Sequence, residues 1–187
     1  MNSISQTNPV ENHLSDALNY FFRTFHIGSI LKRVGASQTK DISALDIFKK
    51  LFELVFDHKS FYMASILKKD DLGMSKSTVS RFLTSCKINW LRFMTLLGKK
   101  VISHVDPLTS EKRIKTFIAD DTVLKRDRAR KTELLSRGFD HSAQRYYNGF
   151  RLLSLAWGDG CSVVPVNGVL LSASTPENLK RKLFHFL

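Results

Sequence analysis

Residues 117–124 read FIADDTVL, an apolar run that is typical of a β-strand and that ends on a pair of aspartates. A carboxylate at the end of a buried strand is well placed to hold a divalent metal ion against a phosphate group. Side chains alternate between the two faces of a strand, so a strand over 114–121 directs Ile118 and Asp120 to one face and Asp121 to the other. Only one aspartate can therefore enter a given site. We take Asp120 as the candidate catalytic metal ligand and Asp121 as the alternative, while Asp-Asp-Thr is also a good turn or cap sequence.

The residues that follow predict a small antiparallel sheet. Two further runs, 146–157 and 161–171, are aromatic and aliphatic, and residues 158–160 between them form a Gly-Asp-Gly turn signal. Pro165 cannot donate to a sheet ladder, which favours an edge position for the last strand. The strand over 114–121 would then have its other side free.

Asp120 has no evident carboxylate partners in the sequence. In an antiparallel meander the second strand runs away from the end of the first, so we expect Asp159 in a hairpin turn roughly 30 Å from Asp120. Glu133, Asp140 and Glu177 do not follow a strand that ends beside Asp120. A single carboxylate is a poor metal site by itself.

The N-terminal half of the chain is expected to be helical. Segments 11–25, 43–57 and 88–104 carry apolar residues at three- and four-residue steps, with Ser43 as a plausible N-cap and Pro107 ending the helical part. A last helix is expected after residue 175. The stripe expected to be buried in the third of these helices is Leu91, Met94, Leu97 and Val101.

The charge of the chain is positive and unevenly distributed. The formal net charge is +12 over 187 residues, and residues 61–115 carry 11 Lys and Arg against 4 Asp and Glu, a net charge of +7. Such an excess indicates a surface that faces a polyanion such as nucleic acid. The alternative is a solvated basic face with no specific partner.

The cysteine and hydropathy patterns point to the cytoplasm. Cys86 and Cys161 lie 75 positions apart, which is no metal-binding spacing, and so few thiols predict a reducing compartment. The N-terminus lacks the basic and apolar regions of a signal peptide, and no apolar run approaches the ~20 residues of a membrane span. The sequence therefore predicts a cytoplasmic protein without a membrane partner.

Residues 66–84 are a helix-turn-helix candidate. They contain DLGMSKSTVSRFL, in which Gly73 could supply the turn and the hydroxyl and basic side chains would face outward. The alternative is a capped helix within a helical bundle. The candidate DNA contacts are Lys76, Ser77 and Arg81.

Residues 125–145 form a basic segment after the acidic strand, and we expect it to emerge beside Asp120, where a DNA backbone would approach. The alternative is a solvated loop or short helix. The candidate phosphate contacts are Lys125, Arg126, Arg128, Arg130 and Lys131.

Three blocks carry a resemblance to a known family. NWLRFMTLLGKKVI (89–102), FIADDTVLKRDRARKTELLSRGFDH (117–141) and YYNGFRLLSLAWGDGCSVVPV (146–166) resemble the DDE transposases of bacterial insertion sequences, in the branch whose first catalytic motif is Asp-Asp-Thr. STVSRFL before the first block fits the same branch. The resemblance covers about residues 60–175.

The resemblance implies an α+β fold. A helical DNA-binding domain over 1–112 would precede, over 113–187, the first β-meander of an RNase H-like catalytic domain. It implies cleavage and transfer of DNA strands at transposon ends with two Mg²⁺ ions, and it places the first catalytic aspartate on Asp120. The second aspartate and the glutamate of the family have no recognisable counterpart. The chain is therefore expected to be an incomplete, truncated N-terminal portion that is inactive alone.

Other expectations follow from the same resemblance. The partners would be transposon-end DNA and either a second copy of the chain or a full-length transposase, at the bacterial nucleoid. The alternative function is a non-catalytic helix-turn-helix DNA-binding protein or an inhibitor of transposition. An unrelated helical protein with a basic surface is the third hypothesis.

Overall fold

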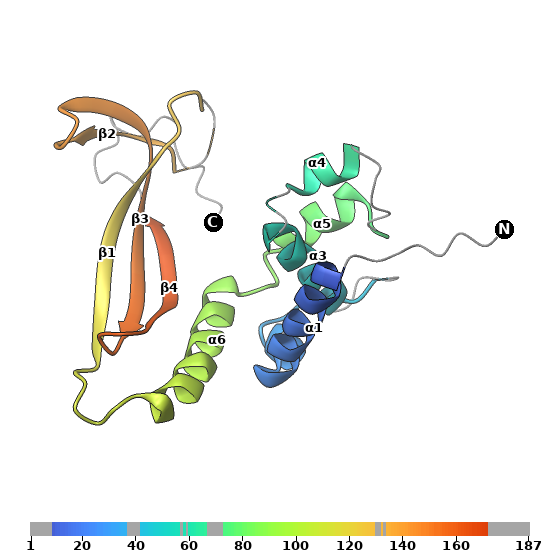
Figure 1. Cartoon of the computed structure of the whole chain (residues 1–187). Coiled ribbons are helices and arrows are strands. Elements are labelled where there is room, and N and C mark those ends of the chain that lie inside the picture. Colours follow the sequence, from blue (N-terminus) through green and yellow to red (C-terminus); the bar gives the residue numbers. More distant parts are fainter. Residues whose placement is uncertain are drawn as a thin grey trace. The chain divides into compact units, whose positions relative to one another are not determined.

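A computed structural model describes residues 9–36, 42–56, 58, 60–66, 73–129, 132 and 134–171. Within these residues, helices come first and strands follow, in the α+β order that the sequence predicts (Figure 1). Contacts divide the chain into two compact units, 1–97 and 98–187, and the division falls within one helix. The predicted boundary at 112/113, between a DNA-binding domain and a catalytic domain, stays a prediction.

The helices are α1 (Pro9–Thr24), α2 (Ile27–Arg33), α3 (Ala44–Phe56), α4 (Phe61–Ile66), α5 (Lys76–Leu83) and α6 (Trp90–Val105), followed by the 3₁₀ turn η1 (Asp106–Leu108).

The first unit is built around aromatic side chains, which bury large areas and form edge-to-face or offset pairs. Phe22 of α1 packs against Phe52 of α3, with ring centroids 5.6 Å apart, and Phe48 of α3 packs against Phe93 of α6 at 5.1 Å. Ile47 of α3 has no exposed surface. The remaining fully or nearly buried residues of this core include Ile27, Ile30, Leu31, Val34, Val79, Phe82 and Ile88.

The helices expected over 11–25 and 43–57 are confirmed as α1 and α3. Ser43 precedes α3, and its Oγ accepts a hydrogen bond from the backbone N–H of Asp46 at 3.1 Å, as an N-cap does. Helices α2 and α4 were not expected. The helix expected after residue 175 lies outside the described residues.

Helix α6 has the expected position, but the expected buried stripe is only partly right: Leu97 packs against the core, whereas Leu91 and Met94 are exposed. Leu91 is 50% exposed and Met94 is 37% exposed, whereas Phe93 is 2% exposed. Asn89 caps the helix, since its Oδ1 accepts the backbone N–H of Arg92 at 2.8 Å. The apolar face that α6 turns to the core therefore runs through Trp90 and Phe93, because these rings fit against Phe48 and Phe82.

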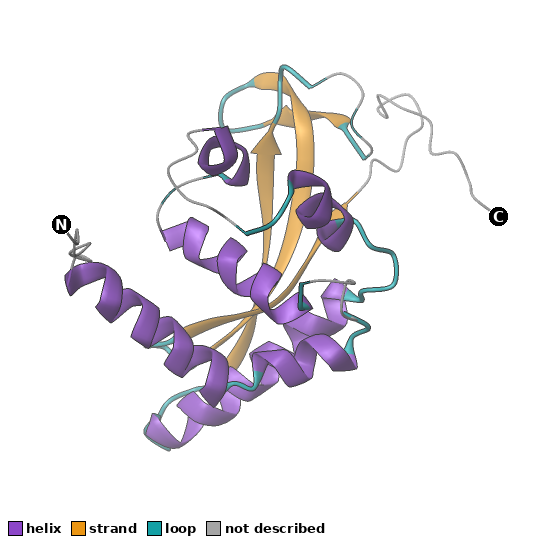
Figure 2. Ribbon diagram, turned by 90° about the vertical axis from the view of Figure 1, so that its right-hand side faces the viewer, coloured by secondary structure: helices purple, strands orange, loops and turns teal. Residues whose placement is uncertain are grey.

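The second unit contains a sheet of four antiparallel strands. Figure 2 shows these strands in orange and the helices of the chain in purple. The strands are β1 (Thr116–Lys125), β2 (Ser136–Asp140), β3 (Arg145–Gly158) and β4 (Val163–Leu171). Strand β1 pairs with β3 along one edge, and β2 and β4 pair with its two ends along the other. β3 is therefore the central strand to which every other described strand is attached, and such an antiparallel arrangement is consistent with part of an RNase H-like domain.

Strand β1 is longer and begins later than the predicted 114–121. It continues through Thr122 and Val123 to Lys125, because these residues extend the ladder opposite Leu152, Arg151 and Gly149 of β3. β-Branched residues fit such a pleated surface. Asp120 is consequently the fifth of ten residues and not the last residue of a strand, which corrects the sequence prediction.

The edge position of Pro165 is confirmed. Among the described strands β4 pairs with β3 alone, and the register shifts between Leu155 and Ala156, so that Pro165 lies next to a β-bulge. Gly98 of α6 comes close to this bulge: a Cβ at position 98 would lie 3.3 Å from the Cα of Val166. The C-terminal half of α6 thus approaches the backbone of β4 at a point where only glycine fits without adjustment.

Candidate functional site

The two aspartates of the Asp-Asp-Thr motif lie on opposite faces of β1, as alternation requires. Asp121 shares its face with Arg151 of β3, and its carboxylate forms an ion pair with that guanidinium, with Arg151 Nε also 3.3 Å from Asp121 Oδ1. The hydrogen bond to Asp121 raises the pKa of Arg151 above its ordinary value, so the guanidinium stays charged. Asp121 is therefore engaged within the sheet.

Asp120 is presented differently. It is exposed, it lies opposite Ser154 of β3, and its Oδ2 accepts a hydrogen bond from the hydroxyl of Thr122 at 2.7 Å. Thr122 is two residues further along the same strand and hence on the same face. This hydrogen bond orients the carboxylate of a residue that is itself exposed. Alternation along the strand could have identified Thr122 as this partner from the sequence.

The described residues supply one carboxylate for a metal ion at this place. Among the described ranges there is no group of three His, Cys, Asp or Glu side chains that could hold a metal ion. Mg²⁺ is usually bound through one or two carboxylates together with water and substrate phosphates. Asp120 therefore fits the role of one ligand, and the described part of the chain does not complete a two-metal site.

Asp159 has a structural position in the turn between β3 and β4, as expected. Its Oδ1 accepts the backbone N–H groups of Cys161 and Ser162 at 3.0 and 2.6 Å, and its Oδ2 accepts the hydroxyl of Thr109 at 2.5 Å. Arg113 Nη1 lies 3.7 Å from the same oxygen, and the side chain of Asp159 is 1% exposed. The Thr109 hydrogen bond and then the backbone donors hold the pKa of Asp159 well below its usual value. This carboxylate ties the segment before β1 to the β3–β4 turn.

The expected distance between Asp159 and Asp120 was too long. Thr116 pairs with Gly158 and Asp120 pairs with Ser154, so Asp159 is only five residues beyond the partner of Asp120, or about 16 Å along the strand. The reason is the register: β1 continues for five residues past Asp120, so Asp120 pairs with Ser154 in the C-terminal part of β3 and not with the start of that strand.

The predicted DNA contacts on α5 are all exposed. Ser75 caps this helix by accepting the backbone N–H of Thr78 at 3.2 Å, and Val79 and Phe82 are buried against the core of the first unit. The outward face carries the three candidate contacts Lys76, Ser77 and Arg81. Residues 67–72 lie outside the described ranges, so the turn of the helix-turn-helix candidate over 66–84 stays a prediction.

The basic segment starts further from Asp120 than expected. Its first residue, Lys125, is five positions along β1, about 17 Å from Asp120, because the strand continues past the aspartates. Lys125 Nζ forms an ion pair with Asp140 of β2 at 2.7 Å. Arg126 and Arg128 are exposed, and the backbone N–H of Arg126 donates to the carbonyl of Asn148 at 2.7 Å. Of the remaining candidates, Arg130 and Lys131 lie outside the described residues.

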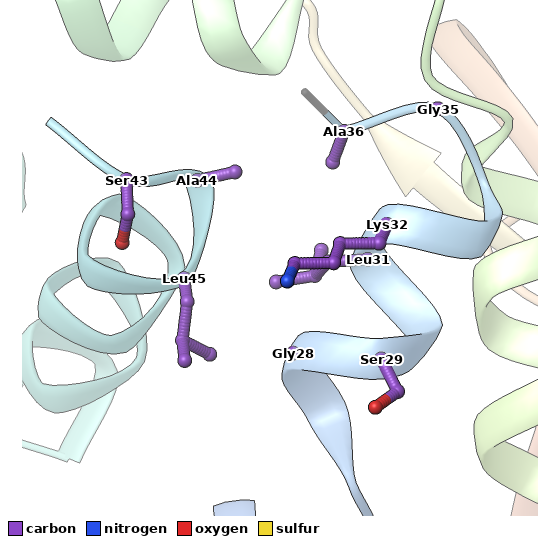
Figure 3. A pocket seen from close by; sticks show the side chains of 9 residues that line it. All are labelled: Gly28, Ser29, Leu31, Lys32, Gly35, Ala36, Ser43, Ala44 and Leu45. Carbon is purple, nitrogen blue, oxygen red and sulfur yellow. The ribbon is translucent and has the colours of Figure 1, made fainter. Parts of the chain in front are cut away.

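A pocket of about 710 Å³ lies between α2 and α3 in the first unit (Figure 3). Its described lining contains the side chains of Leu31, Lys32 and Leu45 and the hydroxyls of Ser29 and Ser43, but no carboxylate. Lys32 is the one charged residue in that lining, so the pocket offers no ligand set for a divalent metal ion.

Comparison with known families identifies the chain. Residues 53–182, more than two thirds of the chain, match the family described as DDE superfamily endonuclease. The chain belongs to the DDE superfamily endonucleases. No curated protein and no solved structure matches it significantly.

Membership of the DDE superfamily endonucleases gives the site its general chemistry. These endonucleases act on nucleic acid and typically use divalent metal ions, and the matched region includes β1 with Asp120. The positive net charge of +12 agrees with a nucleic-acid substrate. No helix in the described part of the chain has both the length and the apolar character needed to cross a membrane.

Proposed function

We propose that this endonuclease-family chain is a transposase of the Asp-Asp-Thr branch found in bacterial insertion sequences, which binds transposon-end DNA and holds Mg²⁺ through Asp120. The proposal is supported above all by the exposed carboxylate of Asp120, oriented by Thr122 on the same face of β1. Asp121, the alternative, is engaged by Arg151 and is the weaker candidate.

A divalent ion at such a site polarises the scissile phosphate and lowers the pKa of the attacking water. The described residues contribute a single ligand to it, and a two-metal site needs more. We therefore expect the chain by itself to bind DNA without cleaving it efficiently, and to reach activity only when further carboxylates join Asp120. A second copy of the chain or a full-length transposase are the partners we propose for that step.

Iron-directed backbone cleavage tests the metal ligand without requiring catalysis. Fe²⁺ bound in place of Mg²⁺ generates hydroxyl radicals with ascorbate and peroxide, which cut the polypeptide near the ion. We expect a fragment that ends near residue 120, competed away by millimolar Mg²⁺ and lost in Asp120→Asn. The matched control is Asp121→Asn, in which the cut should persist. Equal cutting in wild type and Asp120→Asn would refute Asp120 as the ligand.

A non-catalytic DNA-binding function is the second candidate, either as a helix-turn-helix binder or as an inhibitor of transposition. It is favoured by the net charge of +7 over 61–115 and by the exposed basic face of α5. Its test is the salt dependence of binding to transposon-end DNA, in which removing one phosphate contact lowers the log–log slope by about 1. Arg81→Ala should reduce this slope, whereas Asp120→Asn should leave it unchanged.

The two functions are separated by complementation. The chain is mixed with full-length transposase and DNA cleavage is measured. If the chain is a transposase, cleavage should depend on Asp120 of the added chain. If it is an inhibitor, adding it should only reduce cleavage. Metal-dependent cutting of DNA by the isolated chain, abolished in Asp120→Asn, would refute the proposal that the chain alone lacks a complete metal site.

A further inference from the structure

We infer that the exposed face of the β2–β3 hairpin binds an unpaired base of a DNA strand by stacking. This aromatic hairpin face consists of Arg137, Phe139, His141 and Tyr146. The inference rests on the proposed DNA-directed function and adds a second contact to it, remote from Asp120.

The rings of this face are arranged around Phe139. Phe139 and Tyr146 lie directly opposite each other in the β2–β3 register, with ring centroids 5.1 Å apart, and His141 approaches Phe139 at the same distance. The guanidinium carbon of Arg137 lies 4.0 Å from the centre of the Tyr146 ring. Tyr146 is nevertheless 62% exposed and Phe139 37% exposed. A flat base can therefore reach ring and guanidinium surfaces that are already held in place.

The other side of the hairpin is packed, so the exposed rings are not required to form a core. Tyr147 is 5% exposed and lies across Gly138, where an added Cβ would fall 2.8 Å from the Tyr147 Cε1 atom. Leu135, just before β2, and Ser136, its first residue, are 1% and 6% exposed. Glycine at position 138 thus lets the Tyr147 ring cover the strand from behind, and this contact fixes the backbone that presents Phe139 and Tyr146.

The charges around the face suit a phosphate backbone. Asp140 alternates to the opposite side of β2 from Phe139, where its Oδ2 pairs with Lys125 at 2.7 Å and its Oδ1 accepts the Ser142 and Ala143 N–H groups at 3.1 Å. Asp127 accepts the Asn148 N–H at 3.1 Å. Arg126 and Arg128, just after β1, are exposed, whereas Arg145 pairs with Asp140 in the register and so lies on the other side of the hairpin. An aromatic platform that carries an arginine, here Arg137 on the Tyr146 ring, is an arrangement that single-strand binders use, because every base has a face to stack and a phosphate to pair.

The position along β3 links the face to Asp120. Tyr146 and Ser154 are eight residues apart, so both alternate to the same side of the strand, and Ser154 is the residue opposite Asp120. The two places are at most about 26 Å apart along the strand. One nucleic-acid strand following β3 can therefore contact Asp120 and place an unpaired base on Tyr146.

The test uses the full chain and two DNA probes, a blunt duplex and the same duplex with a single-stranded extension that contains 2-aminopurine. Stacking on an aromatic ring quenches 2-aminopurine fluorescence. We expect quenching with wild type, and its loss in Tyr146→Ala together with a weakening of binding to the extended probe by about 5- to 150-fold. Tyr146→Trp should retain both signals, and affinity for the blunt duplex should be unchanged. Tyr20→Ala, which removes a 69% exposed tyrosine of the first unit, is the control.

Cross-strand aromatic pairs also stabilise hairpins, so each variant is first checked by circular dichroism. If Tyr146→Ala does not fold, Tyr146→Leu keeps an apolar cross-strand contact and should still lose the quenching. Unchanged quenching in the folded Tyr146 variants would overturn the inference. It would also be overturned if these variants changed the self-association of the chain but not its binding to the extended DNA probe. Iron-directed cutting at Asp120 and binding of the blunt duplex would then show that the proposed function survives. Absence of any DNA binding by the wild-type chain would overturn both.

Discussion

Gly149 offers a direct test of the strand register that places Asp120. It is the residue of β3 at which β1 and β2 both pair, opposite Lys125 on one side and Ser136 on the other. A Cβ at position 149 would fall against the backbone carbonyl of Leu124 and 3.1 Å from the Cα of Lys125. These are backbone atoms, which cannot rotate away as the end of a side chain can. Gly149→Ala therefore forces the C-terminal end of β1 away from β3.

The expected cost combines two effects. Forcing an extra methyl group into a packed site costs about 1–3 kcal/mol. The separation of the strands also weakens one or two ladder hydrogen bonds, each worth about 1 kcal/mol. We expect the free energy of unfolding of the sheet to fall by about 2–4 kcal/mol, which corresponds to a decrease in melting temperature of roughly 10–30 °C for a unit of this size.

The assay is urea and thermal unfolding of the full chain, followed by the fluorescence of Trp157, which is 6% exposed and belongs to β3. A Trp90→Phe background leaves Trp157 as the sole tryptophan, since the chain has two. The matched control is Gly168→Ala on β4, where the nearest atom to an added Cβ is Leu152 Cδ1 at 3.5 Å, an ordinary contact. This control should lie within about 1 kcal/mol of wild type, on the stabilising side.

Gly149→Ala as stable as Gly168→Ala would refute the reasoning. Lys125 would then not lie opposite Gly149, and the register that puts Asp120 opposite Ser154 would be wrong. A loss confined to Gly149→Ala supports the placement of both aspartates on β1.

The remaining predictions concern the helical core, a helix cap and acid. Ile47→Ala should lower the free energy of unfolding of the first unit by about 2–5 kcal/mol in a urea titration, whereas Val55→Ala, at a 68% exposed position, should change it by less than about 0.5 kcal/mol. Asn89→Ala should cost about 0.5–2 kcal/mol in the same titration, because Arg92 loses its capping acceptor; no loss would mean that this cap does not stabilise α6. The lowered pKa of Asp159 stabilises the sheet above the unfolded-state pKa of about 3.9, and this contribution is lost as the pH falls toward the folded-state value. The urea midpoint should therefore drop between pH 5 and pH 2, with a smaller drop in Asp159→Asn; equal drops would refute this role of Asp159.

The local elements followed from local chemistry. The three- and four-residue steps of Phe and Leu predicted α1 and α3, and an apolar run before Asp120 predicted a strand. These predictions succeeded because alternation and helical periodicity depend on neighbouring residues alone. The buried stripe predicted for α6 was wrong at Leu91 and Met94 for the opposite reason. Leu91 and Phe93 are both apolar, and Phe93 is the one that is buried because its ring packs against Phe48 of α3.

Strand β2 was missed because its five residues, SRGFD, carry few apolar side chains and lie within a basic segment. Its place depends on Tyr147 covering Gly138, a contact between partners nine positions apart that no local pattern reveals. The aromatic hairpin face was missed with it.

The sequence by itself determined that helices precede an antiparallel sheet, that Asp120 and Asp121 point to opposite faces, and that Pro165 lies at an edge, because each depends on backbone geometry within a few residues. Only the tertiary structure decided which aspartate forms an ion pair, because that choice depends on Arg151, thirty positions away, reaching Asp121, while Asp120 accepts its hydrogen bond from Thr122. Register is a long-range property, set by packing between strands, and it fixed both the middle position of Asp120 and the short path from it to Asp159.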